Sequence, residues 1–447
     1  MKEKIQTLIN EKKFSEIREE FRKLNNVEIS DLLNQFDKSE LIIIFRLLSK
    51  DQSADVFSYL EPEQQEIIIN AVTDRETEVL FRNLYFDDMI DIIEEMPSNL
   101  VKKILKNTNS EDRYLINQFL NYPENSAGSI MTTEYVDLKK NMKVSQAIKV
   151  IRDTVEEKEN IYTCYVISED RKLEGVVSLK ELITSEDDVT IESIMNRNFV
   201  SAHANDDQEM VADVIKKYDL IILPVVDIEN RLLGIITIDD IIDVIEQEDT
   251  EDFHKMAGIS PVEETYLKTS AFTMARQRIM WLVVLMISAT FTGRIIKSYE
   301  EVLQSVVVLA SFIPMLMDTG GNAGAQSSTT VIRALSLGDV ETKDIFKILR
   351  KEFLTSTIVA IVLAAINYLR LITLTKISLD VALVVSVTLI LVVIISKVMG
   401  AFLPVVAKTF KLDPAIMAGP LITTILDALT LMIYFKFATI FLSTMIK

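Results

Sequence analysis

Residues 271–447 carry apolar runs that are too long for the core of a soluble protein. No charged residue interrupts the chain between Arg278 and Arg294, or between Glu352 and Arg370. A helix of about 20 predominantly apolar residues crosses the hydrocarbon core of a bilayer. We predict five such spans, at residues 279–297, 302–332, 353–372, 381–407 and 415–443. This part of the chain is therefore expected to be an all-α transmembrane domain with five helices, residues 279–447.

Charge divides the chain at about residue 270. The residues before this point include 31 basic and 56 acidic side chains, whereas those after it include 16 basic and 10 acidic ones. An acidic body repels phosphates, so no nucleic-acid partner is expected. A length of 447 residues suggests about three structural units. We therefore expect a multidomain membrane protein with a large acidic soluble part.

Cysteine and histidine are too scarce for a typical transition-metal site. The chain has one cysteine, Cys164, and two histidines, His203 and His254. Zinc and copper sites normally use several such ligands. A single cysteine cannot form an intrachain disulfide, which fits a reducing compartment. Any metal that this chain handles is therefore expected to be a hard cation with oxygen ligands.

The first residues of the sequence lack the apolar stretch of a signal peptide, so we expect none to be removed.

Residues 1–125 are predicted to form an all-α superhelical N domain. Apolar residues recur three and four positions apart, and Ser, Asp or Pro stands where each short helix would begin. Pro62 suits a first helical turn, and Pro97 follows one apolar stripe and precedes the next. Short helices of this kind, stacked in pairs, are typical of a small α-solenoid.

Residues 126–248 contain an internal repeat. The sequence GSIM at 128–131 returns as ESIM at 192–195, and KLEGVVSLKELI at 172–183 returns as RLLGIITIDDII at 231–242. The first copy carries five extra residues around 156–160. Each copy alternates β-rich runs with amphipathic helices, so we predict two α/β modules.

The repeat resembles a tandem pair of CBS domains, which we place at 126–187 and 188–248. In that family a Ser or Thr followed three residues later by Asp contacts ribose. Thr237 and Asp240 match this pattern, whereas Ser178 and Glu181 only approximate it. The resemblance implies binding of ATP or another adenine nucleotide, although a Thr and an Asp at a strand-to-helix junction also form an ordinary helix cap.

Residues 249–278 are expected to form a connecting helix between the acidic body and the first span. Gly258 and Pro261 mark a break in it. Glu263 and Glu264 would open the helix that follows, because carboxylates suit the positive end of the helix dipole. This segment is the natural mechanical link to the membrane domain.

The second expected span has an unusually polar sequence, PMLMDTGGNAGAQSS at 314–328. Pro314 and three glycines free backbone carbonyls, and irregular backbone survives at membrane depth only where it is buried or lines water. Close packing of small residues would explain the glycines. It would not explain Asp318, Asn322 and Gln326, which are costly in a bilayer unless they serve a function.

The fifth expected span carries a carboxylate, Asp427, about thirteen residues from its start. That is roughly 20 Å along a helix and therefore near the middle of the bilayer. An unpaired carboxylate there costs about 3 kcal/mol or more, so a bound cation or a water-filled path should compensate it. The alternative is an ion pair with Lys397 or Lys436.

These two spans resemble the MgtE family of magnesium channels. The resemblance rests on TGGNAGAQSS at 319–328 and on DPA, GP, TT and Asp427 between residues 413 and 427. It implies the order helical N domain, two CBS domains, plug helix and five spans, and a homodimer whose pore is lined by spans two and five. By position, Asp427 falls on the pore carboxylate, Gly321, Asn322 and Gly324 fall on the Gly-Asn segment, and Asp318 and Pro420 belong to the same lining. One departure is Gly419, where some members carry a polar residue.

The resemblance also implies a magnesium sensor in the acidic body. Magnesium sheds its water reluctantly, so a conducting site should offer few charges and many neutral oxygens. Rising internal magnesium would bridge carboxylates, draw the soluble domains together and close the pore. The expected regulatory ligands are Asp87, Asp91, Asp227, Glu229, Asp239, Asp243, Glu263 and Glu264. A charge run is more often a solvated surface, and that alternative stays open for each cluster.

Flanking charges predict the orientation. Nine Lys or Arg residues flank the spans on the side of the acidic body and five flank the other side. Positive residues favour the cytoplasmic side, so we expect the amino-terminal half inside the cell, the carboxyl terminus outside, and a location in the inner membrane.

Three other functions fit parts of the sequence. A proton- or sodium-coupled exchanger could use Asp427 as its carrier. An intramembrane aspartyl protease could pair Asp427 with the D-T-G triplet that begins at Asp318, but the chain lacks the Y-D and G-x-G-D motifs of such enzymes. A receptor that senses nucleotides and conducts no ions is the third alternative, and the polar second span argues against it because such a receptor would not need polar residues within the membrane. Because no nucleotide-hydrolysis motif is present, we expect a transporter driven by the membrane potential and the ion gradient, and no enzyme.

Overall fold

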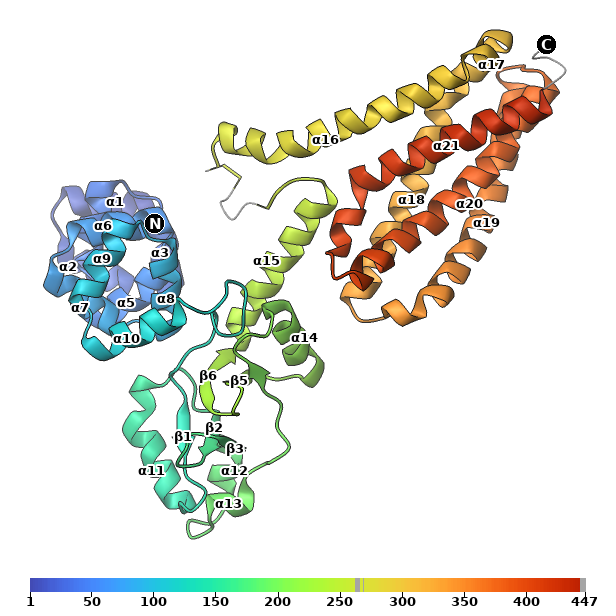
Figure 1. The fold of residues 1–447 in the computed structure, drawn as a ribbon. Coiled ribbons are helices and arrows are strands. Elements are labelled where there is room, and N and C mark those ends of the chain that lie inside the picture. Colours follow the sequence, from blue (N-terminus) through green and yellow to red (C-terminus); the bar gives the residue numbers. More distant parts are fainter. Residues whose placement is uncertain (262–265, 268, 443–447) are drawn as a thin grey trace. The chain divides into compact units, whose positions relative to one another are not determined.

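The computed structural model describes residues 1–261, 266, 267 and 269–442. The chain divides into two compact units, Met1–Ile245 and Glu246–Lys447. The first unit holds a helical domain followed by two small α/β modules, and the second holds the long helices (Figure 1).

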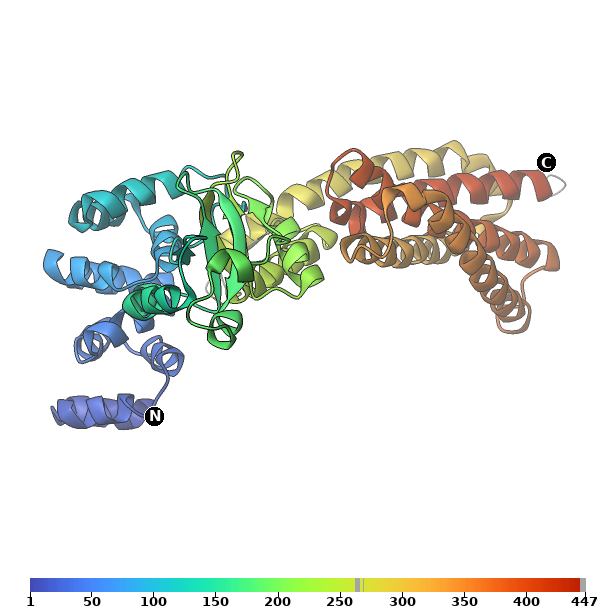
Figure 2. The same ribbon diagram turned by 90° about the horizontal axis from the view of Figure 1, so that it is seen from below.

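Short helices make up the amino-terminal domain, as the sequence predicts. They are α1 (Lys2–Asn10), α2 (Phe14–Phe21), α3 (Asn26–Leu33), α4 (Lys38–Phe45), α5 (Lys50–Ser58), α6 (Pro62–Ala71), α7 (Asp74–Arg82), α8 (Phe86–Glu95), α9 (Ser98–Asn107) and α10 (Ser110–Phe119). Helix α3 packs on α5, α4 on α6 and α7 on α9, and Figure 2 shows the resulting stack.

Local signals set the helix starts. The Asp37 carboxylate accepts the backbone N–H groups of Ser39 and Glu40 at 3.0 and 2.9 Å, which caps α4. Thr73 and Glu76 form a reciprocal capping box at the start of α7. Caps of this kind contribute about 1 kcal/mol each, because they satisfy backbone donors that have no partner within the helix.

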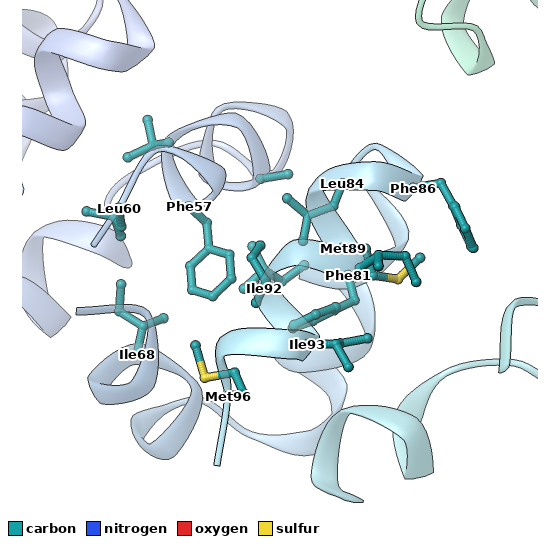
Figure 3. Close-up of a cluster of buried hydrophobic side chains, with 14 of the residues drawn as sticks. Phe57, Leu60, Ile68, Phe81, Leu84, Phe86, Met89, Ile92, Ile93 and Met96 are labelled. Carbon is teal, nitrogen blue, oxygen red and sulfur yellow. The ribbon is translucent and has the colours of Figure 1, made fainter. Parts of the chain in front are cut away.

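An apolar core runs through this domain (Figure 3). The Phe57 ring meets Phe81 edge to face at a centroid distance of 6.1 Å. On α8, Met89 and Ile93 point into this core and are 5% and 3% exposed. Burial of each such side chain contributes about 1.5–3 kcal/mol. The apolar side of α8 is thereby fixed in the core, and Asp87 and Asp91 do not share it.

Two matching α/β modules follow. The first contains β1 (Val136–Leu138), α11 (Val144–Thr154), η1 (Val155–Glu157), β2 (Thr163–Ile167), β3 (Leu173–Ser178) and α12 (Leu179–Thr184), and the second contains α13 (Ile191–Ile194), β4 (Ala202–His203), α14 (Gln208–Tyr218), β5 (Ile222–Val226), β6 (Leu232–Thr237) and α15 (Ile238–Met256). The sheet orders are β1-β2-β3 and β4-β5-β6, each with one parallel and one antiparallel pair. This agreement confirms the predicted CBS pair.

The two modules pack against each other through their sheets. The backbone N–H of Leu173 donates to Asn230 O at 2.9 Å, and that of Leu232 donates to Arg171 O at 3.0 Å. Tyr165, Val226 and Ile235 lie in one shared apolar cluster. The internal repeat therefore forms a single pseudo-symmetric body.

The helix after the second module differs from the prediction. Helix α15 runs unbroken from Ile238 to Met256, whereas the sequence predicts a separate connecting helix at 249–278. No Gly or Pro interrupts this stretch before Gly258, which has a φ of +68°. The next helix, α16 (Ala271–Ser298), starts where the Ser270 hydroxyl accepts the Thr273 N–H at 3.1 Å. Glu263 and Glu264 lie outside the described residues.

The second unit is a bundle of long helices. After α16 come α17 (Glu300–Ser305), η2 (Val307–Phe312), α18 (Ile313–Ser336), η3 (Thr342–Asp344), α19 (Ile345–Thr373), α20 (Leu379–Thr409), η4 (Pro414–Met417) and α21 (Gly419–Phe441). Helix α20 packs against α18, α19 and α21.

Among the described residues, four helical segments are long and apolar enough to cross a membrane. They are Ala271–Ser298, Thr342–Thr373, Leu379–Thr409 and Pro414–Phe441. The second expected span, 302–332, is not among these four, so the count of five stays a prediction. Its long helix, α18, begins only at Ile313, because the short helix α17 ends at Ser305, the chain turns at Val306 and Pro314 occupies the first turn of α18. Helix α18 has 24 residues, a length that suffices for a crossing.

Candidate pore segment and carboxylate cluster

Helix α18 divides its residues between two faces. Gly320, Gly321 and Gly324 are buried. A Cβ added to Gly400 of α20 would lie 2.3 Å from the Gly324 carbonyl oxygen, so the two backbones touch there. A Cβ on Gly321 would lie 3.2 Å from Thr423 Cγ2 of α21. The small residues therefore seat α18 directly against both neighbouring helices.

The other face of α18 is a polar stripe. Asp318, Asn322 and Gln326 recur every four residues, and all three are exposed. The Asn322 side-chain amide donates to Asp318 Oδ1 at 3.0 Å. Exposed polar groups on a helix of this length cannot face hydrocarbon cheaply, so the stripe needs water or another protein surface.

Asp427 lies on α21, half-buried and beside α18. In the described part of the chain it forms no ion pair, and neither Lys397 nor Lys436 contacts it, contrary to the alternative considered from the sequence. The hydroxyls of Thr423 and Thr424 donate to Pro420 O at 2.9 Å each. The structure thus places the predicted pore residues on two adjacent helices, and two of them, Asp318 and Asp427, are carboxylates without an ion pair among the described residues.

A second candidate site lies in the first unit. Oxygen atoms of Asp87, Glu159 and Asp240 all lie within 4.8 Å of one another. They come from α8, from the segment before β2 and from the first turn of α15. Asp87 Oδ1 and Glu159 Oε2 are buried and find no hydrogen-bond partner within the described ranges. Three converging carboxylates with unsatisfied oxygens suit a hard divalent cation.

The raised pKa values of this cluster also fit a site for a divalent cation. Burial raises the pKa of Asp87 to about 6, and the neighbouring Asp88 adds to the rise. Burial, with the charges of Asp87 and Asp240, raises the pKa of Glu159 to about 8. Burial also raises the pKa of Asp240 to about 7, although a hydrogen bond from Thr237 opposes the shift. Without a cation, Glu159 and Asp240 therefore hold protons near neutral pH more readily than Asp87 does.

The predicted sensor residues fall into three groups. Asp87 belongs to the cluster, and the charge of Asp239 acts on all three members of the cluster. Asp91 lies on α8 one turn after Asp87, and Asp243 lies on α15 one turn after Asp240. Asp227 and Glu229 are not brought to the cluster, because both pair with Arg231 in the turn before β6. Sequence reasoning missed Glu159, which lies in the extra residues of the first repeat; an acidic residue in that insertion was the available signal.

The predicted nucleotide pair has a local role. The Thr237 hydroxyl donates to Asp240 Oδ2 at 2.6 Å at the junction of β6 and α15. Asp240 is therefore shared between a helix start and the carboxylate cluster. Ser178 and Glu181 form a capping box at the corresponding place in the first module.

In the second unit, the end of α15 contacts the start of α21. Lys255 Nζ lies 2.5 Å from Glu251 Oε1 and 2.8 Å from Asp413 Oδ2. A Cβ on Gly419, whose φ is +54°, would lie 2.1 Å from Met256 O. The absence of a side chain at 419 is what lets the last turn of α15 come this close.

Comparisons with known proteins cover nearly the whole chain. Residues 313–437 match the MgtE family model, described as a divalent cation transporter; residues 24–125 match the MgtE intracellular N domain; and residues 127–187 and 191–247 match the CBS domain. The magnesium transporter MgtE of Bacillus subtilis is 33% identical over 438 residues, which is 98% of this chain and 96% of that protein. The magnesium transporter MgtE of Thermus thermophilus is 31% identical over 429 residues, 94% of each chain.

Solved structures resemble the soluble part. A cytosolic domain of the Mg²⁺ channel MgtE in complex with ATP is 29% identical, has a TM-score of 0.52, and covers 55% of this chain and 100% of its own. The soluble part of a magnesium transporter gives the same TM-score at 32% identity and covers 97% of its own chain. The family models and the full-length relatives agree with the helical domain, the paired modules and the polar helix α18, and the chain therefore belongs to the MgtE family of divalent cation transporters.

Proposed function

We propose that this chain is a magnesium channel in which two copies form one pore lined by α18 and α21. The observation that carries the proposal is the exposed stripe of Asp318, Asn322 and Gln326 on a helix flanked by apolar spans. A second copy facing this stripe would enclose it in water instead of lipid. The names of the full-length relatives support magnesium as the ion.

The chemistry of the lining suits hydrated magnesium. Two copies would contribute two Asp427 carboxylates, together with amide and hydroxyl oxygens from α18 and α21. Mg²⁺ keeps several of its waters when it binds. A wide site with few charges attracts a divalent ion without holding it in a dense cage, so the ion can leave again.

Magnesium uptake into proteoliposomes tests the pore. We expect Asp427→Asn to lower the uptake rate at least tenfold while the dimer stays intact, because the variant removes the lining charge and keeps the shape. Asp380→Asn is the matched control, since Asp380 is an exposed carboxylate in the first turn of α20. Uptake by Asp427→Asn at the wild-type rate would contradict the proposal. Uptake that requires an imposed proton or sodium gradient would favour a coupled exchanger.

We further propose that the cluster of Asp87, Glu159 and Asp240 binds regulatory magnesium. One ion there would tie the amino-terminal domain to the CBS pair, because the three ligands come from both. Binding favours the arrangement that brings the ligands together and so shifts the population toward it. Internal magnesium would in this way close the pore through α15.

Inhibition by internal magnesium tests the sensor. In patch recordings, Glu159→Gln should raise the half-inhibiting magnesium concentration about tenfold, since it removes one of three charged ligands. Asp170→Asn is the control, because Asp170 is exposed in the turn between β2 and β3. Equal inhibition of Glu159→Gln and wild type would exclude this cluster as the sensor.

Nucleotide binding and membrane placement complete the proposal. The relative solved with ATP supports an adenine nucleotide at the CBS pair, and ATP titration of Thr237→Ala tests whether the Thr237–Asp240 junction contributes. The flanking charges support an inner-membrane location with the amino-terminal half in the cytoplasm and the carboxyl terminus outside. An impermeant thiol reagent applied to intact cells should then label Thr375→Cys but not Asp339→Cys.

A further inference from the structure

A buried lysine lies behind the proposed pore segment. Lys397 is near the middle of α20 and is only 7% exposed. Its ammonium lies 3.3 Å from Ser327 Oγ and 3.5 Å from Gln326 Oε1, both on α18. An ammonium group can only donate hydrogen bonds, and a charge at this depth needs a compensating partner. Asp427 is not that partner.

The partner is reached through a hydroxyl group. Ser327 Oγ donates to Glu352 Oε2 of α19 at 2.6 Å. An O–H···O distance this short is typical of an ionised acceptor. The donors thus run in one direction, from Lys397 to Ser327 and from Ser327 to Glu352. Ser327 itself is 2% exposed, so this relay crosses three helices inside the bundle.

The relay stands beside the backbone-to-backbone contact between α18 and α20. Gly400 lies one turn beyond Lys397 on α20 and meets the Gly324 carbonyl. Ser327 lies three residues beyond Gly324 on α18 and is buried on the same side. Close backbone packing sets how near α18 comes to α20, and the relay fixes its rotation and its height along the axis, because hydrogen bonds are directional.

We propose that Lys397 is a positioning residue for ion permeation, which acts through Ser327 and Glu352 to hold the polar stripe of α18 in register with Asp427. This inference rests on the proposed pore. The competing explanation is that Lys397 only neutralises Glu352 and has no influence on the pore.

Removal of the bridging hydroxyl is the first test. Ser327→Ala keeps both charges and breaks the relay, whereas Ser356→Ala makes an equal change at a fully buried serine whose hydroxyl bonds only within α19. In proteoliposomes we expect Ser327→Ala to lower the magnesium uptake rate about fivefold and to reduce the ratio of magnesium to potassium flux, with an unchanged melting temperature. Ser356→Ala should retain the wild-type rate and ratio. Wild-type values of both for Ser327→Ala would overturn the proposal.

Charge removal separates positioning from neutralisation. Lys397→Met keeps the length of the side chain, and the double variant Lys397→Met with Glu352→Gln leaves no net charge behind. We expect Lys397→Met to lower the ratio of magnesium to potassium flux. The double variant should assemble as wild type does but should show the same lowered ratio, whereas Lys397→Arg should keep most of the wild-type ratio. A double variant with wild-type flux and ratio would show that Lys397 only neutralises Glu352. Asp427→Asn in the same assay reports on the pore itself, so loss of transport there with normal Lys397 and Ser327 variants would refute this inference alone.

Discussion

Glu159 completes a site that neither Asp87 nor Asp240 could form alone. A buried carboxylate oxygen without a partner costs free energy, because it has lost its water and gained nothing in return. Two members of this cluster, Asp87 and Glu159, each carry one such oxygen. Protons satisfy them in part when no ion is bound, and a divalent ion would satisfy them all at once.

A glycine substitution tests the close approach of α18 and α20. Gly400→Ala would place a methyl group 2.3 Å from the Gly324 carbonyl oxygen, and rigid backbone cannot move aside cheaply. We expect a cost of about 1–3 kcal/mol from overpacking, seen as a lower melting temperature in detergent together with reduced magnesium uptake. Gly293→Ala is the control, since nothing lies within 4 Å of its added Cβ. An unchanged Gly400→Ala protein would mean that the two backbones do not touch.

At the residue scale, a local pattern predicts which residues share a face, and the role of those residues in a pore stays a prediction. The polar residues of α18 are visible in the sequence because they interrupt an apolar span, and helical spacing places them on one face. Glu159 escaped, because its partners Asp87 and Asp240 are far away along the chain and only tertiary packing unites them. Lys397 escaped for the same reason, since its acceptor on α18 depends on how two helices rotate against each other.

In the proposed gating, α15 is the element that would carry a signal from the CBS pair to the membrane helices. It begins at the end of β6 and its last turn contacts η4 and α21. Lys255 pairs there with Glu251 and Asp413, and Arg333 of α18 lies 3.3 Å from Asp249. The exposed pair of Arg333 and Asp249 contributes little. The specific part of this contact is therefore the half-buried pairing of Lys255 together with the fit of Met256 against Gly419.

Gly419 offers a test of this contact with a matched control. Gly419→Ala adds a methyl group 2.1 Å from Met256 O, so the end of α15 must withdraw. We expect the variant to conduct more at high internal magnesium, with the half-inhibiting concentration raised several-fold in patch recordings. Gly338→Ala carries the same backbone strain, at a φ of +71°, but has no atom within 4 Å. Should the two variants gate alike, the contact with Met256 has no part in closure.

Helix and strand boundaries, too, were predicted well where local sequence sets them and poorly where it does not. Pro62, Thr73 and the apolar stripes set helix boundaries through local chemistry, and the helices begin close to where those signals stand. The start of α18 was misplaced, because hydropathy continues through Leu309 while the backbone turns at Val306. The expected start of the connecting segment at residue 249 falls inside α15, because no Gly or Pro ends the helix there.

At the scale of the whole molecule, the proposed regulatory magnesium would compete with protons for the same carboxylates. The three cluster residues have raised pKa values in the folded protein, about 6 for Asp87, 7 for Asp240 and 8 for Glu159. A magnesium ion needs them deprotonated, so its binding releases protons and strengthens as the pH rises. The acidic body as a whole, with 56 acidic against 31 basic residues before position 271, adds repulsion that cations relieve.

The sign of the pH dependence follows from linkage. Without magnesium, the folded protein binds more protons than the unfolded chain at the cluster, so the stability that these groups provide is complete below about pH 4 and is lost as the pH rises through 6 to 8. We expect the melting temperature of the full chain in EDTA to fall between pH 5.5 and 8.5, and saturating magnesium to raise it by an amount that grows with pH. The triple variant Asp87→Asn, Glu159→Gln, Asp240→Asn should show a weaker dependence on both, whereas Asp170→Asn should match wild type. A magnesium effect that shrinks as the pH rises would place the regulatory ion elsewhere in the acidic body.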